Sequence, residues 1–175
     1  MKLEDAIRLI SHREISEKDN ARWADLGCGQ GLFTYALANL LKKESIIYAV
    51  DKSAITLGKF PNPNNISIHT EQMDFTKKPL KYNMLNGILM ANSLHFVADK
   101  INFIAAMEKH LAAEGFFLIV EYDTDKSNHC VPYPISAYSL QQLFTGAGFN
   151  NFVKLNELPS LYNSGRIYAA VIKRK

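Results

Sequence analysis

Near the start of the chain, three glycines at alternate positions separate a strand-like run from a helical pattern. The stretch reads WADLGCGQG over residues 23–31, with glycines at 27, 29 and 31. The apolar run ARWADL before it is typical of a buried strand, and apolar residues spaced by three and four after it predict a helix over 31–43. A strand, a glycine-rich turn and a helix in this order are typical of open α/β sheets that bind nucleotide-like ligands.

The rest of the chain alternates between strand-like and helical patterns. Continuous apolar runs predict strands over residues 45–50, 66–70, 84–91 and 116–122. Apolar spacing and capping residues predict helices over residues 4–12, 53–59 with Ser53 as N-cap, 99–115 between Asp99 and Gly115, and 139–148. Two further strand-like segments, 149–155 and 165–175, have only a loop between them.

This order of elements predicts an α/β fold with a mainly parallel sheet. The helix-free final pair of strands is expected to be antiparallel at one edge of the sheet. With 175 residues and no internal repeat or linker, we expect one domain over 1–175, with a short N-terminal helix within 1–20.

Composition narrows the class of protein. Hydrophobic residues make up 47% and charged residues 21%, as in ordinary globular proteins, and the net charge of +3 is too small to favour nucleic acid or an anionic membrane. The two cysteines lack metal-type spacing, and Asp, His and Cys do not cluster at ligand spacing, so no metal is expected. With no signal peptide and no apolar stretch of about 20 residues, we expect a cytoplasmic protein that does not span a membrane.

The spacing of the glycines discriminates among ligands. A dinucleotide fingerprint reads G-x-G-x-x-G, which would place its third glycine at Leu32. The chain instead reads D-x-G-x-G-x-G, from Asp25 to Gly31. The bare backbone would let a ligand lie close to the main chain, and the Asp25 carboxylate would accept a hydrogen bond from a cationic amine rather than face a pyrophosphate. The alternative is a tight turn that binds nothing.

Two more acidic residues lie at predicted strand ends. Asp51, in YAVDK, is placed to accept hydrogen bonds from two ribose hydroxyls, or alternatively to cap a helix. Asp74, in EQMDF, is placed to accept from an adenine amino group, with the Phe75 amide donating to the ring. The alternative for Asp74 is a turn residue.

Together these stretches resemble the class I S-adenosylmethionine-dependent methyltransferases, in particular their small domains. The resemblance covers roughly residues 20–175 and rests on ADLGCGQG, YAVDK, QMDF, ILMANSLHFVAD and AAEGFFLIVEY. It implies a Rossmann-like seven-stranded sheet of order 3-2-1-4-5-7-6 with strand seven antiparallel, and S-adenosylmethionine as cofactor. It also implies the cofactor-binding residues Asp25, Gly27, Gly29, Gly31, Asp51, Lys52, Asp74, Phe75 and Ala91.

The acceptor should lie at the carboxyl ends of the fourth and fifth strands. Asn92 and His95 follow the fourth, and His95 is either a general base or a residue that packs the pocket. After the fifth strand, residues 123–138 show no regular pattern and are expected to form an acceptor-side loop. The substrate candidates are therefore Asn92, His95, Tyr122, His129 and Tyr133.

Methyl transfer from a sulfonium is an in-line displacement, so holding the acceptor in line supplies much of the catalysis. A base is needed only where the acceptor must lose a proton. The favoured function is methyl transfer to a small molecule. A non-catalytic cofactor-binding subunit, an RNA or protein methyltransferase and a nicotinamide-dependent enzyme are the alternatives, although nucleic acid is not the expected partner. A homodimer or a partner chain is expected as a way to complete the acceptor pocket.

Overall fold

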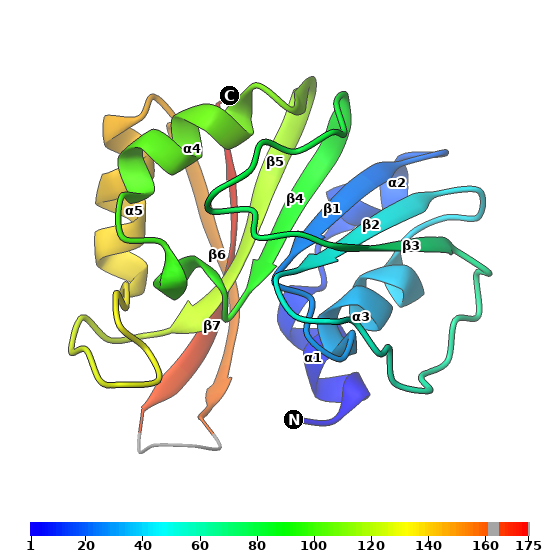
Figure 1. Cartoon of the computed structure of the whole chain (residues 1–175), viewed down its shortest axis with the longest axis horizontal. Coiled ribbons are helices and arrows are strands. Elements are labelled where there is room, and N and C mark those ends of the chain that lie inside the picture. Colours follow the sequence, from blue (N-terminus) through cyan, green and yellow to red (C-terminus); the bar gives the residue numbers. More distant parts are fainter. Residues whose placement is uncertain (161–164, 175) are drawn as a thin grey trace.

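A seven-stranded sheet runs through the protein in the order β3-β2-β1-β4-β5-β7-β6 (Figure 1). The structure, a computed structural model, describes residues 1–160 and 165–174. The strands are β1 (Arg22–Leu26), β2 (Ile46–Asp51), β3 (Ser67–Gln72), β4 (Leu85–Ala91), β5 (Leu111–Tyr122), β6 (Asn151–Pro159) and β7 (Arg166–Lys173). The helices are α1 (Leu3–Ile10), α2 (Arg13–Glu17), α3 (Leu32–Leu40), the 3-10 turn η1 (Leu94–Phe96), α4 (Lys100–Glu108) and α5 (Ala137–Gly146).

The strand directions confirm the fold that the sequence predicts. β1 to β5 pair in parallel, whereas β7 pairs antiparallel with both β5 and β6. β7 therefore lies between β5 and the edge strand β6, and the two final strands form the expected antiparallel pair. Parallel pairing brings the carboxyl ends of β1, β2, β3, β4 and β5 to one edge of the sheet, where open α/β sheets bind ligands.

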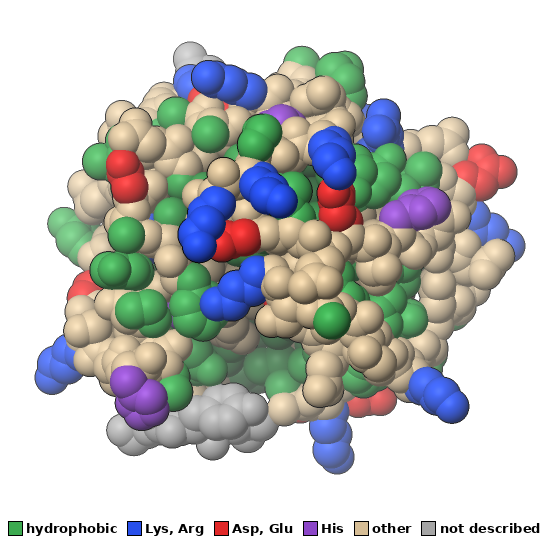
Figure 2. All heavy atoms as spheres, viewed as in Figure 1, with side chains coloured by type: hydrophobic (Ala, Val, Ile, Leu, Met, Phe, Trp, Pro, Cys, Tyr) green, Lys and Arg blue, Asp and Glu red, His purple; other side chains and the backbone are tan. Residues whose placement is uncertain are grey.

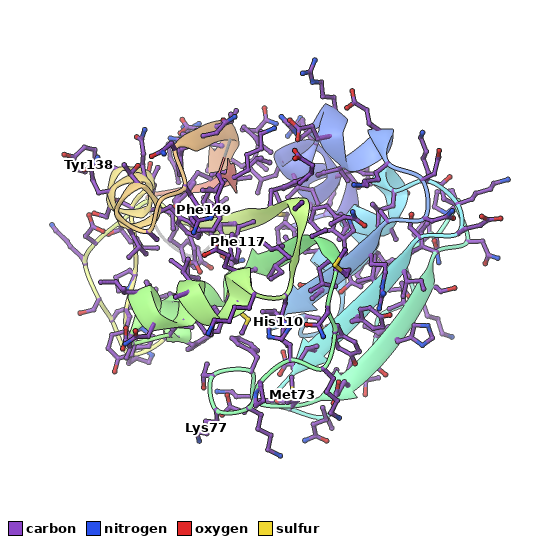
Figure 3. All side chains as sticks on the ribbon, turned by 90° about the horizontal axis from the view of Figure 1, so that it is seen from above. Met73, Lys77, His110, Phe117, Tyr138 and Phe149 are labelled. Atoms are coloured by element: carbon purple, nitrogen blue, oxygen red, sulfur yellow. The ribbon has the colours of Figure 1, made fainter. Side chains whose placement is uncertain are left out.

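Helices cover both faces of the sheet, and each face has its own hydrophobic core (Figure 1). α1 and α3 pack on one face around Trp23, whereas α4 and α5 pack on the other around Phe117. Figure 3 shows Phe117 and Phe149 between α5 and the sheet, and their ring centroids are 5.5 Å apart. Because both faces are covered, the central strands are apolar along their length rather than alternating.

The helix predicted over 53–59 is wrong. Residues 53–66 connect β2 to β3 without a helix, and Ser53 donates its N–H to the Asp51 side chain instead of capping a helix. Gly58 donates its N–H to the carbonyl of Gln30, which holds the segment against the glycine turn. The β-branched pair Ile55–Thr56 and the nearby Pro61 disfavour a helix here, and this tertiary hydrogen bond replaces it.

The helix predicted to end at Gly115 ends at Glu108, because β5 begins at Leu111. A Cβ on Gly115 would lie 2.6 Å from the carbonyl oxygen of Leu85, so this glycine allows β5 to approach β4 closely. The pairing of β4 with β5 shifts register between Leu85 and Gly87. Gly115 therefore marks an irregularity within a strand rather than the end of a helix.

Smaller differences concern the ends of the chain. The helix predicted over 4–12 is confirmed as α1 but ends at Ile10, and a second short helix, α2, follows it. Most of the loop predicted over 123–138 is confirmed, although α5 begins at Ala137. Among the described residues, no helix is both long enough and apolar enough to cross a bilayer.

Candidate functional site

The glycine turn between β1 and α3 adopts backbone conformations that residues with a side chain disfavour. Gly27, Gly29 and Gly31 have φ angles of 85°, 53° and 85°, in the left-handed region. A Cβ on Gly27 would lie 2.4 Å from the Cβ of Ser93, the residue that donates its hydroxyl to the carbonyl of Leu26. The turn is therefore both left-handed and closely packed against the segment that follows β4.

A cavity of about 210 Å³ lies beside this turn, at the carboxyl ends of β2, β3 and β4. Figure 2 shows a hollow in the molecular surface on the face that carries these strand ends. The cavity brings together six of the predicted site residues. Its lining is Gly27, Asp51, Lys52, Asp74, Phe75, Thr76, Asn92, Ser93 and Phe96.

Asp51, at the end of β2, is held by two backbone groups. Its Oδ2 accepts from the N–H of Gly29 at 2.9 Å, and its Oδ1 accepts from the N–H of Ser53 at 2.9 Å. Each carboxylate oxygen has a second lone pair, so the side chain retains acceptor capacity toward the cavity that it lines. The glycine turn thus orients Asp51 before any ligand arrives.

Asp74 shapes the turn after β3. Its Oδ1 accepts from the N–H of Thr76 at 3.0 Å and from the Thr76 hydroxyl at 2.6 Å. These hydrogen bonds, with the nearby Lys77 ammonium, lower the pKa of the Asp74 carboxyl and keep it ionised. Figure 3 shows Lys77 projecting away from the sheet on this loop. The turn-residue interpretation of Asp74 is therefore correct, and the side chain nevertheless lines the cavity beside the buried ring of Phe75.

Asp25 lies at the end of β1 and is 1% exposed. Its Oδ2 accepts from the Thr34 hydroxyl at 2.5 Å, whereas its Oδ1 is buried with no hydrogen-bond partner in the described part of the chain. Burial raises the pKa of the Asp25 carboxyl to about 7, and the Asp51 carboxylate adds to this while the Thr34 hydrogen bond opposes it. A buried acceptor without a donor costs free energy, and a cationic ligand would satisfy it.

The other residues of the glycine turn and its surroundings are also placed near the cavity. Gly31 is the N-cap of α3 and packs against Leu57. Ala91 ends β4, next to the cavity residue Asn92. The Lys52 ammonium lies 5.3 Å from the ring centroid of Phe96, so the two residues pair across one side of the cavity.

A second, smaller cavity of about 120 Å³ shares Asn92 with the first. It is lined by Met1, Leu32, Phe33, Asn92, Tyr122, Ser160 and Ile167. Two of the substrate candidates, Asn92 and Tyr122, therefore meet here. Sequence reasoning missed the contributions of α3, β7 and the first residue, because side chains so far apart in the chain are brought together only by the fold.

His95 lines neither cavity and is 3% exposed. Its ring Nδ1 lies 2.7 Å from Oε2 of Glu121, and its backbone N–H donates to Oε1 of the same carboxylate at 3.1 Å. Sequence reasoning missed Glu121, although a charged residue within the apolar run FFLIVEY was a signal that it has a partner.

Most of the loop after β5 is fixed by hydrogen bonds. Tyr133 donates its N–H to the carbonyl of His95 at 3.0 Å, and the Lys100 ammonium donates to the carbonyls of Val97 and Tyr133 at 2.9 and 2.8 Å. Tyr133 is 47% exposed and lines a surface groove that shares Phe75, Thr76 and Phe96 with the larger cavity. His129 is exposed and lines neither of the two cavities, so the structure does not bring it to the other candidates.

The residues at the larger cavity fit S-adenosylmethionine. The cofactor carries ribose hydroxyls, an adenine amino group and an ammonium, all of which can donate hydrogen bonds, and the cavity lining offers the acceptor carboxylates of Asp51 and Asp74. The unpartnered Oδ1 of Asp25 belongs to the residue two positions before Gly27, which lines the cavity. The aromatic rings of Phe75 and Phe96 offer flat apolar surface for an adenine. Gly27 lines the cavity with its backbone alone, because a side chain at this position would collide with Ser93.

Comparisons with known proteins agree with this geometry. The sequence profile of the family described as methyltransferase domain matches residues 24–119, more than half of the chain. A search among curated proteins gives no match.

Solved structures share the fold at low sequence identity. A SAM-dependent methyltransferase from Aquifex aeolicus is 13% identical with a TM-score of 0.62, and 99% of each chain is covered. The 1,6-didemethyltoxoflavin-N1-methyltransferase of Burkholderia thailandensis is 15% identical with a TM-score of 0.70, covering 99% of this chain and 78% of that one. A cyclopropane-fatty-acyl-phospholipid synthase-like protein from Lactobacillus casei is 12% identical with a TM-score of 0.71, covering 98% and 90%.

Proposed function

Because the chain belongs to the family of S-adenosylmethionine-dependent methyltransferase domains, we propose that it transfers the cofactor's methyl group to a small-molecule acceptor. The observation that carries this proposal is the larger cavity, where the glycine turn meets acidic residues at the ends of β2 and β3. We also propose that residues 1–175 form one methyltransferase domain. We further propose that it acts in the cytoplasm, with its two cysteines reduced.

The proposed cofactor contacts follow from the cavity lining. Asp51 would accept from the ribose hydroxyls, while Asp74 and the Phe75 amide would bind the adenine edge. Asp25, the glycine turn and the backbone at Ala91 would face the methionine part, with the Asp25 carboxylate close to its ammonium. Lys52 would close the cavity together with Phe96.

The bound cofactor supplies an activated methyl group on a sulfonium. The chain's own residues must then hold the acceptor in line with the methyl–sulfur bond, at near van der Waals distance, and exclude water. Oxygen atoms of the site that face the sulfonium would hold it in position through its positive charge. These tasks need positioned groups and no covalent intermediate.

Of the two interpretations of His95, the geometry supports packing over general base catalysis. A general base must reach the proton that it removes within hydrogen-bond distance or through one water. His95 is buried and lines neither cavity. We therefore assign His95 to the support of the segment 92–96 rather than to proton transfer.

A melting curve with S-adenosylhomocysteine, the product form of the cofactor, tests the proposal. At about 100 times the dissociation constant, binding to one site adds about 2.7 kcal/mol to the stability of the folded state. For a domain of this size, we expect the melting temperature to rise by about 5 to 10 °C. Asp51→Ala should abolish the rise, and Asp5→Ala, an exposed aspartate on α1, should retain it. The absence of any rise in the unmodified protein would contradict the proposed function.

A further inference from the structure

A surface groove of about 680 Å³ lies between α4 and the loop that follows β3, and no part of the proposed reaction has been assigned to it. We propose that this groove, called the α4 groove below, is a second ligand site and that it takes a soluble monocarboxylate with an aromatic or alkyl body. The groove is lined by residues 75–79, residues 96–99, Tyr133 and one face of α4 (Asn102, Phe103, Ala106 and Met107).

The bottom of the α4 groove is apolar and aromatic. Phe75, Phe103 and Met107 are buried, and the ring centroids of Phe75 and Phe103 are 5.9 Å apart. Phe96 and Tyr133 also line the groove, but each is 47% exposed. Two half-exposed aromatic side chains beside buried rings offer a large apolar area for a ligand to cover. The body of the ligand is therefore expected to be a ring or an alkyl chain.

The charge at the α4 groove selects the polar group of the ligand. Both Lys77 and Lys78 line it, and the Lys77 ammonium lies 3.5 Å from Oδ2 of Asp74. Lys78 is exposed, and its ammonium forms no ion pair in the described part of the chain. Figure 2 shows Lys and Arg side chains gathered on the face where α4 and this loop lie. One free ammonium beside an apolar surface suits a single carboxylate, whereas phosphate is better matched by the fork of an arginine.

The acidic residue in the lining gives the ligand a direction. Asp99, at the start of α4, accepts from the backbone N–H and from Nδ2 of Asn102, at 3.1 and 2.6 Å. Its carboxylate would repel an anionic group placed beside it. The carboxylate of the ligand therefore belongs at Lys78, and its uncharged body lies along α4. Figure 3 shows the loop that carries Lys77 on the side of α4 away from α5.

The size of the α4 groove favours a small molecule over a protein. Sites for small molecules have volumes of about 300 to 1,000 Å³ and are lined mainly by hydrophobic and aromatic side chains. The α4 groove has both properties. A stable protein interface needs about 20 to 30 residues on each side, and 14 residues line this groove.

The α4 groove shares a wall with the larger cavity. Phe75, Thr76 and Phe96 line both, so a ligand in the groove would contact the residues that we assign to the adenine side of the cofactor. Any change that this ligand makes in the affinity for the cofactor is matched by an equal change in its own affinity, because linkage is reciprocal. The inference goes beyond the proposed function and does not depend on it, since the groove is defined by the chain alone.

The test titrates the full chain, labelled with ¹⁵N, with two probes. Hydrocinnamate carries a carboxylate, and hydrocinnamyl alcohol has the same ring and carbon chain without the charge. We expect hydrocinnamate to shift the amides of Thr76, Lys78 and Asn102, both with and without saturating S-adenosylhomocysteine. It should bind about threefold more tightly than the alcohol, as one exposed ion pair predicts, and about 0.5 M NaCl should reduce this preference.

Two pairs of variants locate the probe. Lys78→Met keeps the stem and removes the ammonium, so the preference for the carboxylate should vanish, whereas the exposed Lys43→Met, outside the groove, should retain it. Ala106→Glu places bulk and a negative charge in the groove and should weaken hydrocinnamate binding about tenfold or more. Ala105→Glu, at the neighbouring exposed position outside the lining, should leave binding unchanged.

Four results would overturn the inference. The first is the absence of saturable hydrocinnamate shifts at the groove amides. The second is displacement of the probe by S-adenosylhomocysteine, which would place it in the cofactor cavity. The third is an unchanged carboxylate preference in Lys78→Met. The fourth is binding of the chain to phosphatidylserine vesicles without binding of free hydrocinnamate, which would assign the surface to a membrane. If S-adenosylhomocysteine does not bind, the proposed function fails, and the titration of the free protein still decides this inference.

Discussion

Glu121 binds His95 through both of its carboxylate oxygens, one to the backbone N–H at 3.1 Å and one to ring Nδ1 at 2.7 Å. Glu121 is 1% exposed and lies near the end of β5, whereas His95 belongs to η1, which follows β4. The pair therefore joins the ends of two parallel strands. Because η1 follows directly from Asn92 and Ser93, it also fixes the segment where the two cavities meet.

Removing this carboxylate should destabilise the protein. Glu121→Ala leaves the N–H and the ring nitrogen of His95 buried without their acceptor, at about 1 to 3 kcal/mol for each unsatisfied group. We expect the free energy of unfolding to fall by about 3 kcal/mol, measured by urea denaturation. Glu114→Ala, at an exposed position of the same strand, should change it by less than about 0.5 kcal/mol. Equal effects of the two substitutions would contradict the structural role of the pair.

One methyl group added to the glycine turn should strongly reduce both stability and cofactor binding. Gly27→Ala places a side chain at a φ of 85°, which costs about 1 to 2 kcal/mol, and forces its Cβ against Ser93. We expect a lower melting temperature and at least tenfold weaker binding of S-adenosylhomocysteine by calorimetry. In Gly146→Ala, by contrast, the new Cβ would meet no atom within 4 Å at the end of α5. That variant should bind normally and be slightly more stable.

The raised pKa of Asp25, about 7, predicts a pH dependence of cofactor binding. Below this pH the free protein holds the carboxyl protonated, whereas a bound ammonium favours the carboxylate. Binding then releases a proton, so the affinity for S-adenosylhomocysteine should rise with pH by up to tenfold per unit below pH 7 and level off above it. Calorimetry between pH 5.5 and 8 measures this slope. Asp25→Asn should remove the slope, and the exposed Asp19→Asn should leave it unchanged.

The same shift makes the ligand-free protein less stable as pH rises. The folded-state pKa of Asp25 lies above its unfolded value of 3.8, so between about pH 4 and pH 7 the folded state binds more protons than the unfolded state. Stability from this group is present below pH 4 and is lost progressively up to pH 7. Denaturant unfolding of the parent and of Asp25→Asn across this range would show the difference.

Removing the Lys100 ammonium should loosen the loop after β5 locally. Its ammonium donates to the carbonyls of Val97 and Tyr133, and burial lowers its pKa while the nearby Glu121 carboxylate opposes that shift. Lys100→Met keeps the apolar stem and loses both hydrogen bonds. We expect the Tyr133 amide, which donates to His95, to exchange its hydrogen faster. The exposed Lys109→Met should leave this exchange rate unchanged, and a slow Tyr133 amide in Lys100→Met would refute the prediction.

The parts of the fold that were predictable from the sequence depend on local patterns. A few consecutive residues are enough to recognise the apolar runs of β1, β2 and β5 and the glycine turn. The segment 53–66 was not predictable in this way, because its conformation is set by a hydrogen bond from Gly58 to the distant Gln30. For this segment, tertiary contacts override weak local preferences.

The candidate site also has a part that local sequence patterns predict and a part that they do not. Asp25 and Asp51 were identifiable because each one interrupts or ends an apolar run, and Asp74 because it follows the predicted third strand. The pairing of Glu121 with His95, and the meeting of Leu32 with Ile167 in the smaller cavity, join residues that are far apart in the chain. No spacing in the sequence encodes such contacts, since they depend on the twist and order of the finished sheet.

The position of β7 between β5 and β6 has a consequence for synthesis on the ribosome. β6 leaves the ribosome before β7, yet β7 is its pairing partner within the described sheet. Until residues 166–173 emerge, β5 also lacks a neighbour on that side and exposes an apolar edge from Phe117 to Tyr122. This half of the sheet therefore cannot form until β7 has been synthesised. Until then, the unpaired edge of β5 can associate with other chains.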